Sequence, residues 1–435
     1  MVYLDYNATT PLSAAAREAM RPFLEEHFGN PSSVHAAGRE ARAAIDDARD
    51  RLAALLGAKP HEIIFTSGGT ESNNLAVLGL ARRHANKGRH LISNRAEHHA
   101  VLHALEHLEK REGFEVTWLD VSREGLVDSE QVERAIRSDT VLVSIMAANN
   151  ETGVIQPMTE ISARCRKHGV LLHSDMVQAF GKLNPVIPSG AEGGVEGPRG
   201  EPGSFLAEVA VSVAPRDPST SLRSARDDGE VGNLGQADAA SFAAHKFHGP
   251  KGAGFLYLRS GIPIDPIQFG GAHENERRPG TENVAAIVGM AAAAKEVLKD
   301  LPNEQAREAK LRDQLWHGIQ RVFPGAQENA ARAPRLANTL NVSFLGFDSE
   351  TMLMALDLEG VCASSGSACM VGSVVASHVL LALGLSAERA GSAIRFSLGK
   401  ETTASEIEQT IAAVQRIWER LQTRSRRESA THAVV

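Results

Sequence analysis

The segment from Glu62 to Arg83 reads EIIFTSGGTESNNLAVLGLARR, and it decides how the first half of the chain is built. Its first residues are apolar and rich in isoleucine, which predicts a buried strand over Glu62–Thr66. A Ser-Gly-Gly turn follows, and helical spacing of apolar residues then predicts a helix over Thr70–His84. A buried strand that passes directly into a helix is typical of a crossover unit in a parallel sheet.

The same alternation of strands and helices extends over the first 180 residues. Further strands are predicted at 89–93, 114–119, 140–145 and 170–173, and helices at 13–27, 35–56, 98–111, 129–136 and 158–168. Beyond residue 237 strands become fewer, with strands predicted at 254–257, 339–344 and 393–397 and helices at 282–299, 304–323, 349–359, 377–383 and 404–423. The pattern predicts an α/β protein with a mostly parallel sheet, followed by a smaller α+β domain. Such sheets bind ligands at the carboxyl ends of their strands.

Residues 185–236 interrupt this pattern. They hold 6 Pro and 9 Gly among 52 residues, with Ser, Asp and Arg filling much of the rest. A segment of this composition and length predicts an insert rather than part of the sheet.

Composition and charge exclude several classes of protein. The 46 Lys and Arg against 53 Asp and Glu leave a net charge of −7, which argues against a broad nucleic-acid surface or a polybasic membrane anchor. The longest apolar stretch, Ala285–Ala294, is far shorter than the roughly 20 residues of a membrane helix. Three cysteines, Cys165, Cys362 and Cys369, make no disulfide framework, and the first residues show no signal or transit pattern. We therefore expect a cytoplasmic enzyme.

The turn at Thr66–Glu71 has two interpretations. Its glycines allow a close approach of an anion to the free N–H groups of the following helix, which makes a phosphate cradle closed by Thr70. A plain tight turn with Thr70 as a helix cap is equally compatible with these residues alone. Asp175 lies just past a predicted strand, where α/β enzymes bind ligands. Its carboxylate could hold a protonated ring nitrogen, a ribose or a metal ion, or it could only cap the loop.

Two segments carry candidate nucleophiles. Lys246 lies between an apolar strand and a Gly-rich turn, where desolvation would favour a Schiff-base amine, whereas Lys251 fits a structural role. Cys369 lies in a loop of small residues and fits a nucleophilic thiol, whereas Cys362 and Cys165 fit packing roles.

Histidine and arginine complete the set of candidates. His98 at a helix start could stack on an aromatic ligand or move a proton. The histidines that follow it at helical spacing favour a solvated helix face over a metal site, since two further ligands are not evident. Arg395 in a strand requires a carboxylate partner, from a substrate or from the protein. Together these groups match the needs of pyridoxal 5'-phosphate (PLP): an amine, an acid, a phosphate cradle and a stacking ring.

From about Tyr3 to Leu421, apart from the insert, the chain resembles the cysteine desulfurases, PLP enzymes of the class-V aminotransferase group. The shared motifs, in order, are LDYNATTP (4–11), GNPSSVH (29–35), TSGGTESNN (66–74), EHHAV (97–101), NNETG (149–153), HSDMVQ (173–178), HKFHGPKG (245–252), RPGTEN (278–283), SSGSAC (364–369) and IRFSLG (394–399). The SSGSAC motif is similar to that of the subgroup with a long cysteine loop, which serves iron–sulfur cluster assembly, nitrogenase maturation and tRNA thiolation.

The resemblance implies a role for each site residue. The implied catalytic residues are Cys369, which takes the sulfur of the substrate as a persulfide, Lys246, which forms the Schiff base with PLP, and His98, which stacks on its ring. Asp175 would contact the ring nitrogen, Gln178 the ring oxygen, and Asn150 and Arg395 the substrate carboxylate. The implied cofactor-binding residues are Gly69, Thr70, His98, Asn150, Asp175, Gln178, His245, Lys246 and, from a neighbouring subunit, Thr281. No intrinsic metal is implied, only transient contact of Cys369 with a nascent cluster.

The resemblance also implies the architecture and the partners. It implies the type I fold of PLP-dependent transferases, with a seven-stranded, mostly parallel sheet in a large PLP-binding domain over 13–300 that includes the insert at about 185–236. A smaller α+β domain over 1–12 and 301–423 would carry the cysteine loop, and 424–435 would form a disordered tail. The implied reaction converts L-cysteine to L-alanine in a homodimer and passes sulfur to an iron–sulfur scaffold or sulfur-carrier protein, without nucleic acid or membrane.

Three features depart from the family pattern. Ala243 stands two residues before the His-Lys pair, where the family usually has a serine that donates to the phosphate. The residues after Cys369 read MVGSVVASH, without the acid–proline pair often found there, and the insert falls between Asp175 and Lys246. The alternatives are therefore a selenocysteine lyase or aminotransferase on the same scaffold, or an impaired scaffold protein; Cys369 in SSGSAC argues against a transaminase.

Overall fold

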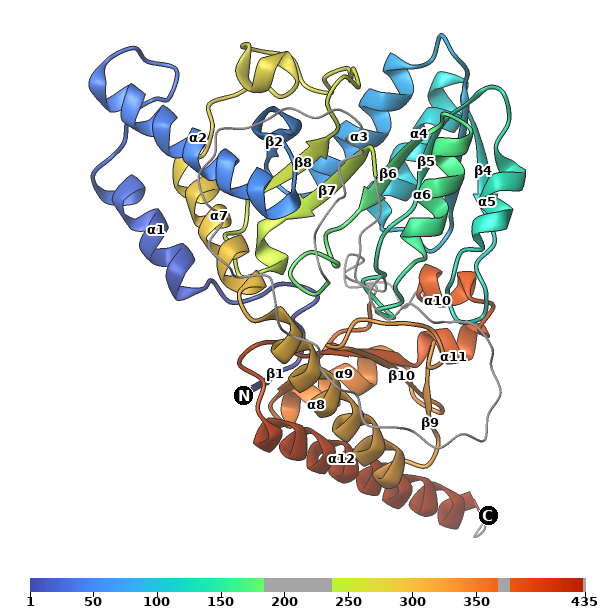
Figure 1. Cartoon of the computed structure of the whole chain (residues 1–435). Coiled ribbons are helices and arrows are strands. Elements are labelled where there is room, and N and C mark those ends of the chain that lie inside the picture. Colours follow the sequence, from blue (N-terminus) through green and yellow to red (C-terminus); the bar gives the residue numbers. More distant parts are fainter. Residues whose placement is uncertain (184–236, 367–375, 433–435) are drawn as a thin grey trace.

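The computed structural model describes residues 1–183, 237–366 and 376–432, and Figure 1 shows their arrangement. Two layered parts are visible, one around a large sheet and one around smaller sheets near both chain termini (Figure 1).

The large part is organised by one sheet of seven strands in the order β2-β8-β7-β6-β5-β3-β4. These strands are β2 (Ile63–Thr66), β3 (His90–Asn94), β4 (Glu115–Leu119), β5 (Thr140–Ser144), β6 (Leu171–Asp175), β7 (Ala239–Ala243) and β8 (Gly254–Leu258). The pairs from β4 to β7 are all parallel, and only β8 runs antiparallel to its neighbours β7 and β2. The predicted mostly parallel seven-stranded sheet is confirmed.

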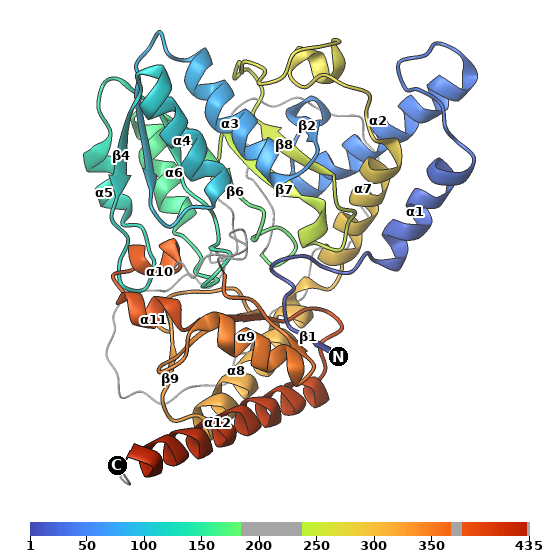
Figure 2. The same cartoon turned by 180° about the vertical axis from the view of Figure 1, so that it is seen from behind.

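Helices cover both faces of this sheet. They are α1 (Ala14–Glu25), α2 (Ala36–Leu56), α3 (Gly69–Arg83), α4 (His99–Glu112), α5 (Ser129–Ala135), α6 (Met158–Lys167) and α7 (Val284–Leu298), with short 3-10 turns η1 (Pro60–Glu62), η2 (Ala244–Lys246) and η3 (His273–Glu276). The apolar faces of α3 and α4 bury one side of the sheet, as Figure 2 shows, and those of α2, α5, α6 and α7 bury the other. Burial on both faces explains why the strand sequences are almost continuously apolar.

The second part combines the C-terminal residues with the start of the chain. Its strands are β1 (Val2–Tyr3), paired in parallel with β11 (Val361–Cys362), and an antiparallel sheet of β12 (Ala393–Ser397), β10 (Thr339–Phe344) and β9 (Ala326–Glu328). Its helices are α8 (Leu301–Val322), α9 (Ser349–Leu358), α10 (His378–Ala382), α11 (Ala387–Gly391) and α12 (Ala404–His432). Val2 and Leu4 pack in one apolar core with α8, α9 and α12. We propose that this core and the core of the large sheet mark the two domains, with the boundary near residue 300.

The C-terminal end differs from the expectation of a disordered tail over 424–435. Helix α12 continues through this stretch to His432. The physical reason lies in the residues after Thr423, which include neither Gly nor Pro and so provide no helix stop.

The strands on either side of the insert pair directly. His173, Ser174 and Asp175 of β6 lie opposite Ala239, Ala240 and Ser241 of β7. Most of the connection between β6 and β7 lies outside the described residues. The sheet is nevertheless continuous where β6 ends at Asp175 and where β7 leads to Lys246.

Candidate active site

A cavity of about 340 Å³ opens where the parallel strands of the large sheet end. Residues from the N-terminus, from β6, β7 and α3, and from the C-terminal part line it together. Its lining is Asn7, Ala8, Gly69, Thr70, Asn73, His98, Met146, Ala148, Asn150, Asp175, Val177, Gln178, Ala243, His245, Lys246, Gly366 and Arg395. The structure thus brings together every cofactor- and substrate-binding residue predicted from the sequence except Thr281, and both described catalytic candidates, His98 and Lys246.

The turn between β2 and α3 forms one wall of the cavity. Gly68 has φ of 152° and ψ of −175°, a backbone conformation that is essentially restricted to glycine. A Cβ atom on Gly69 would lie 2.7 Å from Cγ2 of Val177, so the backbone here approaches the opposite wall closely. Helix α3 begins at Gly69, and its first N–H groups are therefore available to an anion in the cavity.

Lys246 closes the 3-10 turn that follows β7. Its Nζ donates to the backbone oxygens of Asn7 at 2.6 Å and Ala8 at 2.9 Å. These carbonyls belong to the LDYNATTP motif, so the N-terminal segment holds the lysine in the cavity from the other side of the site.

Asp175 is the last residue of β6 and is buried. Its Oδ2 accepts from Nδ2 of Asn73 at 2.6 Å, and its Oδ1 accepts from the backbone N–H of Val177 at 2.9 Å. A carboxylate has about four lone-pair sites, so it keeps capacity for one further donor from the cavity. Asn73, which sequence reasoning missed, orients the acid, and its place in the TSGGTESNN motif was the available signal.

His98 is the N-cap of α4, and this position determines its tautomer. Its Nδ1 accepts from the backbone N–H of Ala100 at 3.1 Å. The ring proton must therefore be on Nε2 when the ring is neutral. Burial lowers the pKa of His98, and Lys246 acts in the same direction while Asp175 opposes it. The side chain therefore offers a flat, neutral ring at neutral pH.

His245 precedes the reactive lysine and is also held neutral. Burial, together with the charges of the neighbouring Lys246 and Lys251, lowers its pKa to about 4. Its Nδ1 lies 3.3 Å from Oγ1 of Thr9. A neutral imidazole can donate one N–H to a phosphate oxygen.

Arg395 and Asn150 face the cavity from two different parts of the molecule. The guanidinium of Arg395 donates through Nη1 to the backbone oxygen of Asn150 at 2.9 Å and through Nη2 to Oδ1 of Asp5 at 2.8 Å. Arg395 is only 3% exposed, and its Nε has no partner, nor has Oδ1 of Asn150. The expected carboxylate partner is thus present in the protein as Asp5, and Arg395 retains one unused donor.

Gln178 belongs to a polar cluster centred on Asn7, which sequence reasoning missed. The backbone oxygen of Asn7 accepts from Nε2 of Gln178 at 2.9 Å as well as from Lys246. The side chain of Asn7 contacts Lys182, Asn338 and Thr339. The position of Asn7 within LDYNATTP was the only available signal, because its partners are distant in the sequence.

Two predicted residues are not among those that line the cavity. Cys369 lies outside the described residues, although the chain that precedes it is anchored at the site: Ser364 pairs with Arg395 through two backbone hydrogen bonds, and Gly366 lines the cavity. Thr281 is exposed and does not line the cavity of its own chain. Burial raises the pKa of Cys165 to about 12, which keeps that thiol protonated. Within the described ranges, no group of three or more His, Cys, Asp or Glu residues is arranged to hold a metal ion.

The cavity fits pyridoxal phosphate on its own features. Buried polar atoms on its walls, Oδ1 of Asn73, Oδ1 of Asn150 and Nε of Arg395, have no hydrogen-bond partner, which indicates a polar ligand. A glycine cradle at a helix N-terminus suits the phosphate, and the amine of Lys246 and the carboxylate of Asp175 line the same cavity, as PLP requires.

Comparison with known proteins identifies the family. Residues 2–187 and 231–410 match the family described as aminotransferase class-V. The chain belongs to the class-V aminotransferase family. The unmatched residues 188–230 fall within the Pro- and Gly-rich insert.

Individual relatives of this member of the class-V aminotransferase family are similar over nearly its whole length. The cysteine desulfurase IscS of Dictyoglomus turgidum is 43% identical over 422 residues, which cover 97% of this chain and 95% of that protein. The cysteine desulfurase IscS of Methanosarcina thermophila is 39% identical over 424 residues, covering 98% and 93%. The solved structure of a NifS-like protein gives a TM-score of 0.80 at 34% identity and covers 96% of this chain and 99% of that one.

Proposed function

We propose that this chain is a PLP-dependent cysteine desulfurase, which converts L-cysteine to L-alanine and first stores the sulfur as a persulfide on Cys369. The observation that carries the proposal is the single cavity in which the predicted cofactor and carboxylate residues meet. Relatives named cysteine desulfurase, 39% to 43% identical over nearly the full length, support it.

The proposed cofactor site uses residues on four sides of the cavity. Gly69, Thr70 and His245 would bind the phosphate, and Asp175 would hold the proton of the ring nitrogen. His98 would stack on the ring, and Gln178 would donate to the ring oxygen. When bound, PLP would supply an electron sink for the substrate.

The substrate carboxylate would be placed by Arg395 and Asn150. The unused Nε of Arg395 is a donor that the cavity leaves available for it, and the Nδ2 amide of Asn150 would be the second donor. Because Asp5 and the backbone of Asn150 already hold the guanidinium in one orientation, little conformational entropy would be lost when the substrate binds.

Lys246 and Cys369 would perform the bond changes. Nζ of Lys246 would take the α-proton of the bound cysteine and later return a proton to carbon. The Cys369 thiolate would attack the substrate sulfur, so that an S–S bond forms and the Cβ–S bond breaks. The electron pair of the broken bond stays on Cβ and is protonated, which yields alanine and leaves the extra sulfur on Cys369.

The assay that tests this proposal uses the full-length protein with PLP, L-cysteine and dithiothreitol, which reduces the persulfide and releases sulfide. We expect sulfide and alanine in equal amounts. Cys369→Ala should abolish both products while the yellow colour of the PLP-bound protein remains.

The matched control is Cys362→Ala, because Cys362 is half-buried outside the cavity and should leave both products unchanged. Sulfide release that survives Cys369→Ala would overturn the proposed nucleophile. A wild-type protein that PLP cannot turn yellow would overturn the PLP mechanism as a whole, and mercaptopyruvate in place of alanine and sulfide would favour an aminotransferase.

We further propose that the enzyme acts in the cytoplasm as a homodimer and passes its sulfur to an iron–sulfur scaffold or sulfur-carrier protein. Helices long and apolar enough to span a membrane are absent from the described part of the chain. The exposed position of Thr281 supports a role at a partner's phosphate site rather than at its own. Phe28 and Val34, which flank the GNPSS motif, and Phe269 are 91%, 89% and 89% exposed, which supports a buried subunit interface.

A further inference from the structure

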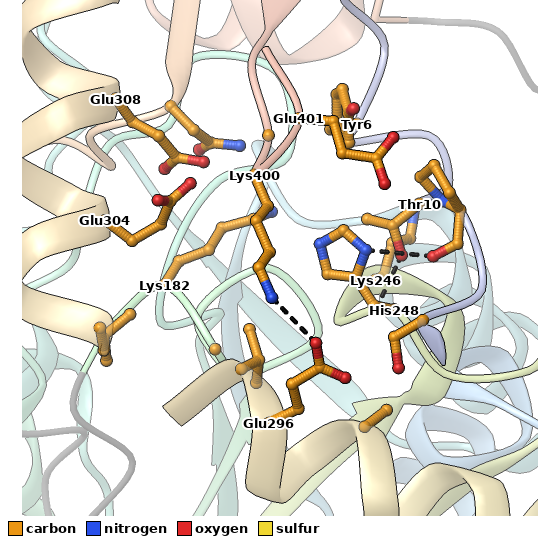
Figure 3. Close-up of a pocket in the computed structure, with 18 of the residues that line it drawn as sticks. Tyr6, Thr10, Lys182, Lys246, His248, Glu296, Glu304, Glu308, Lys400 and Glu401 are labelled. Atoms are coloured by element: carbon orange, nitrogen blue, oxygen red, sulfur yellow. Dashed lines mark hydrogen bonds and ion pairs between the residues drawn. The ribbon is translucent and has the colours of Figure 1, made fainter. Parts of the chain in front are cut away.

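A second cavity of about 510 Å³ shares Lys246 with the proposed cofactor site, and Figure 3 shows it. Lys246 lines both cavities. The walls come from residues 6–17 near the N-terminus, the junction of α7 and α8, and residues 398–401 after β12. One half-buried lysine in this cavity, Lys182, has no role in the proposed mechanism.

Lys182 connects the second cavity to the cofactor site. Its Nζ donates to Oε1 of Gln178 at 2.6 Å and to Oδ1 of Asn7 at 3.0 Å. Its backbone is held from α8, where the side chain of Gln305 donates to the oxygen of Lys182. The side chain is thus fixed at both ends, and it reaches the two residues that border Lys246.

The contact with Lys182 determines which way the Gln178 amide faces. A lysine ammonium has three donors and no acceptor, so only the oxygen of the amide can face it. Nε2 of Gln178 then points away from Lys182, and one of its two hydrogens bonds to the backbone oxygen of Asn7. The second hydrogen remains available on the side of the cofactor cavity, which Gln178 lines.

Asn7 gives Lys182 a second connection, to Lys246 itself. The Asn7 side-chain oxygen accepts from Lys182, and its backbone oxygen accepts from Nζ of Lys246 at 2.6 Å. Asn7 is 1% exposed and Gln178 is 4% exposed, so water has little access to weaken these bonds.

We propose that Lys182 is a positioning residue, which fixes the Gln178 amide with its donor side towards the ring oxygen of PLP and so lowers the proton affinity of the Lys246–PLP chromophore. The proposal rests on the proposed function only in requiring that PLP binds to Lys246.

The sign of the effect follows from electrostatics. A hydrogen bond to the ring oxygen stabilises its negative charge most when the neighbouring nitrogen has lost its proton, and a nearby cation acts in the same direction. Removing Lys182 removes both effects, so the chromophore should hold its proton to a higher pH. In the structure itself, burial lowers the pKa of Lys182 to about 7, with Lys246 and Arg395 acting in the same direction and Glu308 opposing them. A negative ring oxygen would favour the ammonium form.

The test is a pH titration of the visible absorption of the PLP-bound protein, which needs no turnover. Lys182→Met should raise the pKa of the chromophore by about one unit, a tenfold change in proton affinity, since it removes a charged hydrogen-bond donor. Gln178→Ala should also raise it, and the double variant should shift the pKa by less than the sum of the two single variants, because the two residues share one contact.

The matched control is Lys400→Met. Lys400 lines the same cavity and carries the same charge, but its Nζ pairs with Glu296 at 2.8 Å, the contact that Figure 3 marks. Its removal should leave the titration of the chromophore unchanged. If Lys182→Met does not fold, Lys182→Gln tests the same point, because a neutral amide lacks the charge and can also accept a hydrogen bond.

The possible outcomes separate the two proposals. Three results would each overturn the positioning role. The pKa of the chromophore could shift equally in Lys182→Met and Lys400→Met, or it could stay unchanged in both Lys182 variants. The third result is a double variant whose shift equals the sum of the Lys182→Met and Gln178→Ala shifts. A protein whose chromophore behaves as expected but that releases no sulfide from cysteine would overturn the proposed function alone. A wild-type protein without a chromophore on Lys246 would overturn both.

Discussion

Single residues decide how strongly this site can hold its cofactor, and Ala243 is the position that departs from the family pattern. Ala243 is buried at the end of β7, and its Cβ lies 3.4 Å from where a side chain on Gly69 would begin. It therefore faces the glycine cradle at the start of α3. A hydroxyl at this position would be close to the proposed phosphate site.

Ala243→Ser should therefore tighten PLP binding by about tenfold, because it adds one hydrogen bond to a charged group, on the order of 1.5 kcal/mol. The measurement is the dissociation constant of PLP from absorption titration of the apoprotein. Ala244→Ser, one residue further along and packed against Gly249 instead, is the control and should not tighten binding. An unchanged dissociation constant for Ala243→Ser would mean that the phosphate is satisfied by other donors.

At the scale of the element, the junction of β2 and α3 requires a backbone conformation that other residues cannot adopt. Gly68→Ala should destabilise the protein by about 1–3 kcal/mol and weaken PLP binding, because φ of 152° at this position strains any residue with a Cβ. Urea unfolding of the apoprotein measures the first effect independently of the cofactor.

Gly391→Ala provides the matched control for Gly68→Ala. Gly391 lies in α11 with open space around it and no positive φ, so alanine should be neutral or stabilise by about 0.5–1 kcal/mol. Equal destabilisation by both substitutions would contradict the argument from backbone strain.

At the same scale, helix α8 places a buried carboxyl group in the second cavity. Glu308 is 8% exposed. Burial, together with the neighbouring Glu304 and against the opposing effect of Lys182 and Arg307, raises its pKa to about 8. The folded state therefore binds this proton more tightly than the unfolded state, whose glutamate pKa is about 4.3. The stability that this group contributes is complete below about pH 4 and declines as the pH rises through about 8.

Glu308→Gln should remove this pH dependence. The stability of the variant relative to the wild type should be greater at pH 8.5 than at pH 5.5, as measured by the urea midpoint at each pH. Glu401 is an exposed carboxyl group that lines the same cavity. Glu401→Gln should therefore show the same difference in urea midpoint between pH 5.5 and pH 8.5 as the wild type. This prediction would be contradicted if the wild type gained stability between pH 5.5 and pH 8.5 and Glu308→Gln did not, because ionisation of Glu308 should destabilise the folded state.

At the scale of the whole molecule, the exposed apolar side chains predict association of two copies. Phe269→Asp should shift the protein from dimer to monomer, because a charge in a buried apolar interface is costly. Sedimentation velocity measures the change, and PLP binding should weaken in parallel if Thr281 of the second subunit contacts the phosphate. A wild-type monomer at micromolar concentration would contradict the proposed homodimer.

The sequence by itself determined the class of fold and most of the candidate chemistry. The alternation of apolar strands with amphipathic helices predicted the parallel sheet, because the two periods of secondary structure are local properties. Local sequence also identified the main candidate site residues, because each lies beside a predicted strand or at a predicted helix start. These are Lys246, Asp175, His98 and the Gly68–Gly69 turn.

Only the tertiary structure decided which residues support these groups. Asn7 meets Gln178, Lys246 and Lys182, and Asp5 meets Arg395, across hundreds of residues of sequence. Such contacts depend on how the N-terminal segment packs between the two cores, which no local pattern encodes. The direct pairing of β6 with β7 across the insert likewise follows from the assembled chain. Local patterns determine elements, whereas the partners of a buried polar group are determined by long-range packing.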